Sequence, residues 1–209
     1  MNQFTEKIKR GYDKIANIWY EKRDWYIEKK AITDIIAMLK RGVKILDVGC
    51  GSGKPIAKYL KDKGFDVYGI DISPKQLEYA KQIIAKDKLF NTDILNFSTS
   101  IKFEAIICWF TLFHIHISLH EEVLRKLHRL LKPQGLLLIT FADTSFQPET
   151  PFNRIDDYTI ESEMFGEYFY HSGLPAEINS QLVENNGFSI LSDKIDQPGN
   201  QVILAKRLT

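Results

Sequence analysis

Short apolar runs alternate with helical apolar spacing along the middle of the chain. The runs at 43–47, 65–70, 105–110 and 136–141 predict strands, and the segments between them carry apolar residues three or four positions apart, which predicts helices. The run at 105–110 is continuously apolar, as in a parallel strand buried on both faces. This alternation predicts an α/β fold with a single Rossmann-like, doubly wound and mostly parallel sheet.

Two parts of the chain depart from this alternation. Residues 2–20 and 24–40 precede the first strand, and their apolar spacing predicts two helices that form a lid. Residues 143–172 follow no regular period and are rich in aromatic side chains, which predicts an ordered insertion. Within the alternating part, Ser73 and Ser118 are each followed three residues later by Gln or Glu, so both are expected to cap helices.

The C-terminal part predicts one helix and an antiparallel pair of strands. Pro175 and Gly187 bound the helix, and the runs at 188–195 and 201–206 flank a Pro-Gly turn. Such a hairpin would insert into the parallel sheet. The chain is therefore predicted to be one domain, 1–209, with four parts: a helical lid (1–40), a cofactor-binding core (41–142), an insertion that forms the acceptor pocket (143–174), and a C-terminal helix and hairpin (175–209).

Composition bears on partners and location. The 209 residues are 44% apolar, which is enough for one α/β core. With 28 basic and 27 acidic residues the formal charge is +1, so nucleic acid is not a favoured partner. No signal segment and no apolar run near ~20 residues is evident, so a cytoplasmic protein without a membrane span is expected. The oligomeric state is left open.

The two cysteines, Cys50 and Cys108, have neither the spacing of a disulfide framework nor that of a metal site. No metal is expected. Both residues are interpreted as small buried hydrophobic side chains.

The segment from Asp47 to Gly53 has the features of a nucleotide-binding turn. A strand ends in Asp47, and Gly49, Gly51 and Gly53 follow. Glycine admits positive φ and a close approach of backbone to ligand. A dinucleotide fingerprint has its third glycine at the sixth position, where this chain has Lys54. The pattern therefore favours a cofactor without a pyrophosphate, such as S-adenosylmethionine, over NAD(P).

Two more acids follow later strands. Asp71 ends the second strand, where a carboxylate can accept hydrogen bonds from both hydroxyls of a ribose. It predicts a ribosyl cofactor without separating NAD from S-adenosylmethionine. Asp93 lies where a third strand should end and could accept from an adenine amino group, although an Asn-Thr-Asp cluster is also ordinary turn chemistry.

Three segments carry a resemblance to a known family: DVGCGSGKPIAKYL at 47–60, GFDVYGIDISP at 64–74 and CWFTLFHI at 108–115. With 170–177 and 186–188, they resemble the class I S-adenosylmethionine-dependent methyltransferases of a bacterial, small-molecule-type branch. The resemblance covers nearly all of the chain and implies methyl transfer to a small-molecule acceptor. One departure is Phe110, where the branch often has an acid.

The resemblance also implies which residues hold the cofactor. Asp47 and the backbone carbonyl of Trp109 are expected near its ammonium group, and Arg23 near its carboxylate. The expected cofactor-binding residues are Tyr12, Arg23, Asp47, Gly49, Cys50, Gly51, Gly53, Asp71, Ile72, Asp93, Ile94 and Trp109.

Two histidines are candidates for the acceptor pocket. His114 and His171 fall at or beside the carboxyl ends of strands, where ligands collect in open α/β sheets. A packed imidazole bonded to a backbone carbonyl explains His114 equally well. His116, His120 and His128 are expected on the surface. The expected acceptor-pocket residues are Trp19, Phe110, His114, Tyr170 and His171, and the candidate catalytic residues are His114 and His171.

The sequence leaves the acceptor open. A methyl group on a sulfonium is already activated, so the protein must chiefly hold the acceptor in line and exclude water. An O–H or N–H⁺ acceptor would use a base, whereas a thiolate, a free amine or an enolate would not. Two other functions also stay open: a non-catalytic S-adenosylmethionine-binding module and, disfavoured by Lys54 and the hairpin, an NAD-dependent oxidoreductase.

Overall fold

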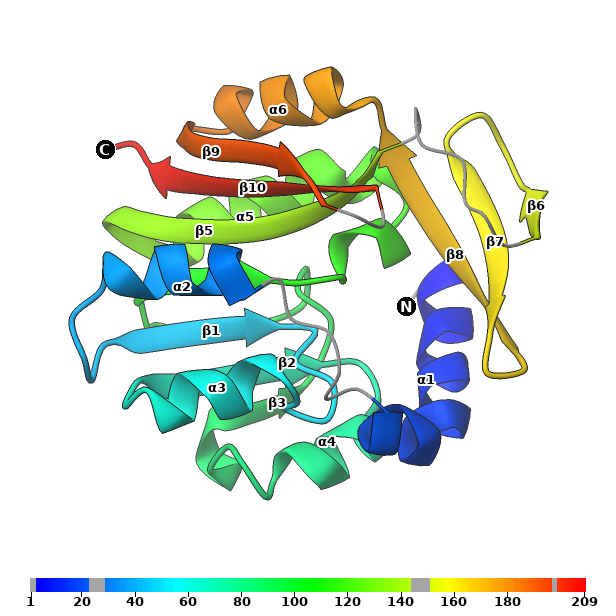
Figure 1. The fold of residues 1–209 in the computed structure, drawn as a ribbon, viewed down its shortest axis with the longest axis horizontal. Coiled ribbons are helices and arrows are strands. Elements are labelled where there is room, and N and C mark those ends of the chain that lie inside the picture. The colour runs from blue at the N-terminus through cyan, green and yellow to red at the C-terminus, as the bar shows by residue number, and fades with distance from the viewer. Residues whose placement is uncertain (1–2, 23–28, 144–150, 197–198) are drawn as a thin grey trace.

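A computed structural model describes residues 3–22, 29–143, 151–196 and 199–209. Its parallel strands lie in the order β3-β2-β1-β4-β5 (Figure 1). Because the order reverses between β1 and β4, a crevice opens at the carboxyl ends of these two strands. The five strands are β1 (Lys44–Val48), β2 (Asp66–Asp71), β3 (Leu89–Asn91), β4 (Phe103–Cys108) and β5 (Leu131–Asp143).

The C-terminal hairpin extends this sheet. Strand β10 (Asn200–Arg207) runs antiparallel to β5 and pairs on its other side with β9 (Phe188–Ile195), which is also antiparallel to it. The prediction of a Rossmann-like, mostly parallel sheet with an antiparallel hairpin strand at the C-terminus is confirmed.

Helices cover both faces of the sheet because its strands are apolar on both sides. On one face, α5 (His120–Leu130) and α6 (Ala176–Asn185) pack against a cluster that includes Leu46 and Ile106. On the other, α2 (Lys29–Ala37) and α3 (Ile56–Asp62) pack against Ile45 and Ile107. The alternation of Ile45 and Leu46 between these clusters follows the period of two in a strand.

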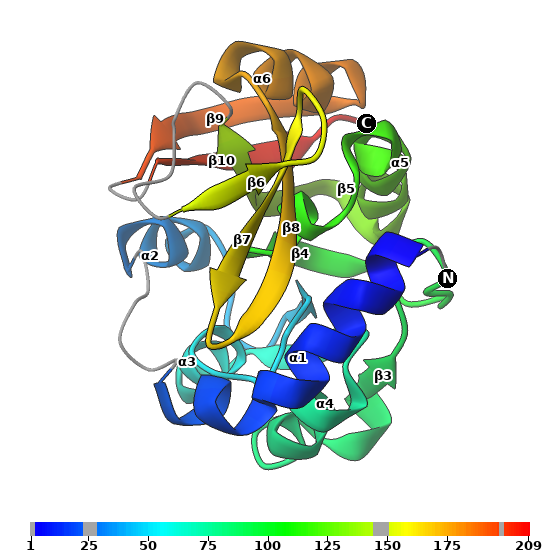
Figure 2. The same cartoon turned by 90° about the vertical axis from the view of Figure 1, so that its right-hand side faces the viewer.

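A second layer lies across the carboxyl edge. Helix α1 (Gln3–Lys22) runs alongside β8 (Glu167–Leu174), which pairs with β7 (Thr159–Met164) and, through it, β6 (Phe152–Arg154) (Figure 2). Strand β8 joins the end of β5 at Gly173 and Leu174. Ile8 and Ile15 of α1 pack on the fully buried Phe169.

One expectation about these segments was wrong, and one was incomplete. Helix α2 does not act as a lid, because Ile32 and Ile35 are fully buried against the sheet. The insertion was predicted without any secondary structure, and residues 152–174 of it form three strands. Their side chains are buried on neither face consistently, so they leave no period of two in the sequence.

Two expectations around α5 were also wrong. Ser118 lies in a short 3₁₀ turn, Ile117–Leu119, and α5 begins at His120. His120 is fully buried rather than at the surface, and its Nε2 donates to the carbonyl oxygen of Ile115 at 2.8 Å. Burial lowers the pKa of His120 to about 4, so its ring is neutral at pH 7 and supports the loop after β4.

Candidate functional site

A cavity of about 370 Å³ is lined by residues at the carboxyl ends of β1, β2 and β4 and by side chains of α1. This is the position and the size of a ligand site in an open α/β sheet. The residues expected from the sequence that line it are Tyr12, Trp19, Asp47, Gly49, Cys50, Gly51, Asp71, Ile72, Asp93, Ile94, Trp109, Phe110 and His114.

Three of the expected site residues that the structure describes are not in the lining. Gly53 ends the glycine turn, with its N–H donating to the carbonyl oxygen of Cys50. Tyr170 faces a separate groove between α1 and the β7–β8 hairpin, where its ring lies 4.9 Å from Phe4 and its centroid 4.6 Å from the Lys7 Nζ. His171 packs beside His114 and Phe113. Arg23 lies outside the described residues.

The turn after β1 depends on glycine at position 49. Gly49 has a φ of +70°, and a Cβ there would lie 2.1 Å from Oγ1 of Thr111. The N–H groups of Gly49 and Cys50 both donate to the carbonyl oxygen of Ile70, at 2.8 and 3.0 Å. Thr111 in turn donates its hydroxyl to the carbonyl oxygen of Val48 at 3.0 Å. The close contact brings the β1 turn and the loop after β4 together at the cavity.

Asp71 anchors this turn as well as lining the cavity. One carboxylate oxygen accepts from the N–H of Gly51 and the other from the N–H of Ser73, both at 2.8 Å. Burial raises the pKa of Asp71 to about 6, and these two N–H donors oppose that rise. The sequence predicted a ligand contact for Asp71 and missed its role in holding the turn.

Several polar atoms beside the cavity are buried and unpartnered. They are Oδ2 of Asp47, Nε1 of Trp109, and both side-chain amide atoms of Gln76. Burial, together with the nearby Asp71 charge, raises the pKa of Asp47 to about 8. A buried polar group without a partner is costly, so this set fits a ligand that is cationic beside Asp47 and offers donors and acceptors. S-adenosylmethionine, with its sulfonium, ammonium and hydroxyl groups, meets this requirement.

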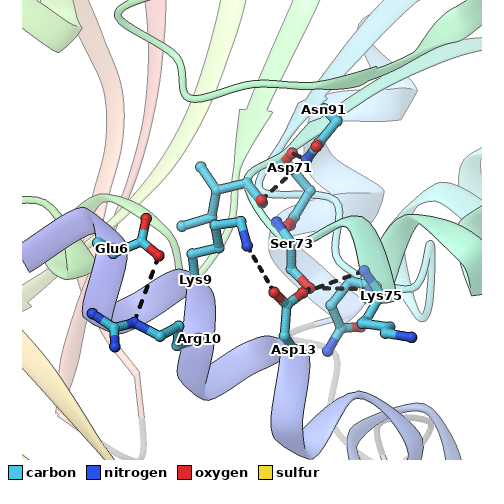
Figure 3. Close-up of polar contacts among 10 residues, drawn as sticks. Glu6, Lys9, Arg10, Asp13, Asp71, Ser73, Lys75 and Asn91 are labelled. Carbon is cyan, nitrogen blue, oxygen red and sulfur yellow. Dashed lines mark hydrogen bonds and ion pairs between the residues drawn. The ribbon is translucent and has the colours of Figure 1, made fainter. Parts of the chain in front are cut away.

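Helix α1 is tied to the start of α4 (Pro74–Ala80) by polar contacts of Asp13 (Figure 3). The carboxylate of Asp13 accepts from Oγ of Ser73 at 2.7 Å and pairs with Lys9 at 2.9 Å. Ser73 caps α4 by accepting from the N–H of Gln76 at 3.1 Å, as expected. Partial burial by itself would raise the pKa of the Asp13 carboxyl. The hydrogen bonds from Ser73 and Lys9 have the larger effect together, so the pKa of Asp13 lies below its usual range.

A tyrosine and a histidine meet under α1. Oη of Tyr12 lies 2.8 Å from Nε2 of His114, and Nδ1 of His114 lies 2.8 Å from the carbonyl oxygen of Tyr170. The ring of His171 is 5.1 Å from that of His114, and burial lowers the pKa of His171 to about 4. An effective general base has a pKa near the working pH, so His171 is poorly suited to that role.

Several residues of the lining were not predicted from the sequence. Thr5 and Ile8 precede Tyr12 at helical spacing on α1, and this spacing was the signal that could have found them. Gln76 was interpreted as a capping residue, but its side chain makes no cap and borders the cavity. No sequence pattern indicated Thr111, because its role depends on how closely the backbone of Gly49 lies to its side chain.

Within the ranges that the structure covers, no group of three or more His, Cys, Asp or Glu side chains is placed to hold a metal ion. None of the described helices has the length and apolar character needed to cross a bilayer.

Comparisons with known proteins place this site in a family. Residues 21–192 match the family described as "Methyltransferase domain". The protein YqeM of Bacillus subtilis is 34% identical over 192 residues, covering 75% of this chain and 77% of that protein. An uncharacterized methyltransferase of Oceanobacillus iheyensis, OB1106, is 30% identical over 115 residues, 54% of this chain and 53% of that protein.

A more distant relative has a named substrate. The tRNA N(3)-methylcytidine methyltransferase trm140 of Schizosaccharomyces pombe is 25% identical over 210 residues, 89% of this chain and 64% of that protein. The chain thus spans about half the length of the Oceanobacillus relative and less than two thirds of the Schizosaccharomyces one.

Solved structures share the fold at low identity. The DhpI complex with S-adenosylhomocysteine superposes with a TM-score of 0.74 at 14% identity, covering 98% of this chain and 97% of that one. The CcbJ methyltransferase from Streptomyces caelestis gives 0.73 at 13% identity, with 95% and 98% covered. The chain belongs to the methyltransferase domain family and has the fold of the class I S-adenosylmethionine-dependent methyltransferases.

Proposed function

We propose that this chain transfers the methyl group of S-adenosylmethionine to a small-molecule acceptor by in-line displacement. The observation that carries the proposal is the cavity at the β1–β4 reversal, where buried unpartnered atoms of Asp47, Gln76 and Trp109 border a glycine turn. When bound, the cofactor supplies a methyl group activated by a positively charged sulfur. The work left to the chain is to bind, orient and exclude water.

Each strand end has a proposed contact with the cofactor. Asp71 accepts from the ribose hydroxyls through lone pairs that Gly51 and Ser73 leave free. Asp47 and the carbonyl oxygen of Trp109 receive the ammonium group. Asp93 faces the adenine, although its carboxylate also accepts from the backbone N–H and side-chain amide of Asn96.

The size of the cavity, and the side chains of α1 that line it, favour a small molecule as the methyl acceptor. The cofactor and the acceptor must share a cavity of about 370 Å³, which is at the lower end of the range for small-molecule sites, and side chains of α1 line part of it. A formal charge of +1 gives no general attraction to a polyanion. The names of the relatives include both acceptor classes: phosphoethanolamine N-methyltransferase 3 of Arabidopsis thaliana, 28% identical over 174 residues, has a small molecule in its name, and the Schizosaccharomyces relative has tRNA.

The test is the fate of a labelled methyl group. The purified protein is incubated with methyl-labelled S-adenosylmethionine and cell extract, which is then separated into small-molecule, RNA and protein fractions. Label in the small-molecule fraction supports the proposal. Label only in RNA contradicts the acceptor class, and binding without transfer to any fraction identifies a non-catalytic module.

We expect the affinity for S-adenosylmethionine to rise as pH increases from 6 to 8. Burial raises the pKa of Asp47 to about 8 and that of Asp71 to about 6, whereas a bound cation favours the ionised carboxylates. Binding should therefore release protons. Calorimetry across this pH range, in buffers of different ionisation enthalpy, measures both effects.

The stability of the folded protein also depends on pH through these two carboxyl groups. A carboxyl whose pKa is raised on folding stabilises the folded state below its unfolded pKa, and this contribution is lost as pH rises through the folded value. The increase in melting temperature caused by the cofactor should thus be larger at pH 8 than at pH 6. Asp47→Asn should reduce the pH dependence, and an affinity that falls with rising pH would contradict the assignment.

A further inference from the structure

We propose that Asp13 is a positioning residue that holds helix α1 over the bound cofactor through its hydrogen bond with Ser73, and thereby sets how slowly the cofactor leaves. This inference rests on the proposed contact between Asp71 and the ribose. It goes beyond the methyl transfer itself, because neither Asp13 nor Ser73 is among the residues that line the cavity.

Helix α1 forms part of the wall of the cavity. Four of its side chains, spread over most of its length, line the cavity: Thr5, Ile8, Tyr12 and Trp19. A ligand in the cavity contacts these side chains only while α1 is docked. Because a ligand favours the state that it binds more tightly, the bound cofactor stabilises the docked helix. Coupling of this kind is reciprocal, so a contact that holds α1 docked also stabilises the bound cofactor.

A chain of hydrogen bonds runs from the cavity to α1 (Figure 3). Asp71, which lines the cavity, accepts from the N–H of Ser73 at 2.8 Å. The hydroxyl of Ser73 donates to Oδ1 of Asp13 at 2.7 Å, and the same hydroxyl oxygen accepts from the N–H of Gln76 at 3.1 Å. Ser73 is fully buried. This serine therefore connects the proposed ribose-binding carboxylate, the first turn of α4 and helix α1.

The carboxylate of Asp13 is ordered from both helices. Its Oδ2 pairs with Nζ of Lys9, one turn earlier in α1, at 2.9 Å, and its Oδ1 also accepts from the N–H of Lys75 at 3.3 Å. The side chain of Asp13 is only 22% exposed. Hydrogen bonds to an ionised carboxylate are stronger than those between neutral groups, and solvent screens a partly buried charge less than an exposed one. Asp13 is thus a strong acceptor held in one place.

Other described contacts between α1 and α4 do not reach the cavity lining. The hydroxyl of Tyr79 donates to the side-chain oxygen of Asn17 at 3.0 Å, and the ring of Tyr79 stacks on that of Tyr20 with 4.4 Å between centroids. These three residues are uncharged partners outside the lining. The contact of Asp13 differs from them because it ends on Ser73, which bonds directly to Asp71.

The rate at which S-adenosylhomocysteine leaves the full chain is the first test, measured by stopped-flow displacement. Asp13→Ala removes the contact without weakening α1 itself, because alanine is the best helix former. We expect the dissociation rate to rise by about tenfold, within the range of about 5- to 150-fold that is typical of coupled sites, and the association rate to change little. Asp13→Asn, which keeps an accepting oxygen without the charge, should give an intermediate rate.

The matched control is Glu6→Ala on the same helix. Glu6 pairs with Arg10 at 3.6 Å, an exposed ion pair that stays within α1, so its loss should leave both rates unchanged. A purely structural role for Asp13 makes a different prediction from ours. Asp13→Ala would then lower the melting temperature of the ligand-free protein and release the ligand at the wild-type rate, and that result would overturn the proposal.

A double-mutant cycle tests whether Asp13 acts through Ser73. Because Ser73→Ala removes the partner of Asp13, the protein that carries both Asp13→Ala and Ser73→Ala should release the ligand no faster than Ser73→Ala alone. Independent effects that multiply in the double variant would show that Asp13 acts by another route and would overturn the proposal.

Hydrogen exchange of the α1 amides measures docking directly. In the ligand-free proteins these amides should exchange faster in Asp13→Ala than in the wild type, and S-adenosylhomocysteine should slow their exchange in both. Exchange in α1 that neither the ligand nor the substitution alters would contradict the coupling. A wild-type protein that binds no S-adenosylhomocysteine would instead overturn the proposed function.

Discussion

Gly49→Ala is expected to abolish cofactor binding and to destabilise the fold. The backbone at position 49 has a φ of +70°, which costs a residue with a Cβ about 1–2 kcal/mol. The added Cβ would also lie 2.1 Å from Oγ1 of Thr111, and overpacking of this kind costs about 1–3 kcal/mol more. Moving Thr111 away shifts the loop that closes the cavity. Calorimetry with S-adenosylhomocysteine and thermal unfolding measure the two effects.

Two glycines away from the site provide matched controls. Gly42 and Gly64 have φ values of +79° and +85°, and a Cβ at either would meet no atom within 4 Å. Gly42→Ala and Gly64→Ala therefore carry the backbone strain without the clash. They should lower the melting temperature less than Gly49→Ala and leave cofactor affinity unchanged. Equal effects in all three variants would show that the contact with Thr111 is unimportant.

Asp71→Ala should lower cofactor affinity by more than about 100-fold, because two charge-assisted hydrogen bonds of about 1.5–3 kcal/mol each are lost. It should also lower stability. The N–H groups of Gly51 and Ser73 would lose their acceptor, at about 1–3 kcal/mol for each group that stays unsatisfied. Calorimetry and urea unfolding separate these losses.

Asp71→Asn distinguishes the two roles of this residue. The amide keeps the size and one accepting oxygen, so it should retain part of the stability while still weakening binding. Asp62→Ala serves as the surface control, since Asp62 pairs with Lys58 on α3 and both side chains are more than half exposed. A folded Asp71→Ala protein with wild-type affinity would remove Asp71 from the site.

The core and the cofactor end of the cavity were predictable because chain order alone positions them. Burial on both faces makes residues 105–108 of β4 continuously apolar. Asp47 and Asp71 lie at the carboxyl ends of parallel strands and Gly49 directly follows one, and the carboxyl ends of such strands meet at one edge. Topology therefore brings them together, whatever the side chains around them do.

The acceptor end could not be predicted in the same way. Tyr12 and His114 are 102 positions apart, and His114 and Tyr170 are 56 apart. Their contacts depend on how α1 packs against β8, and the spacing of apolar residues within either segment does not predict that packing. Tyr170 was expected in the acceptor pocket, but its side chain lines the separate groove and its carbonyl oxygen accepts from His114. His171 was expected in the pocket and instead packs beside it.

Calorimetric titration with S-adenosylhomocysteine, with NAD as the comparison, distinguishes the two cofactors that a ribose-binding site could hold. We expect one site of micromolar affinity for S-adenosylhomocysteine and no heat of binding for NAD. At about 100 times its dissociation constant, the ligand should add about 2.7 kcal/mol to the free energy of unfolding. Binding of NAD, with no response to S-adenosylhomocysteine or S-adenosylmethionine, would contradict the account.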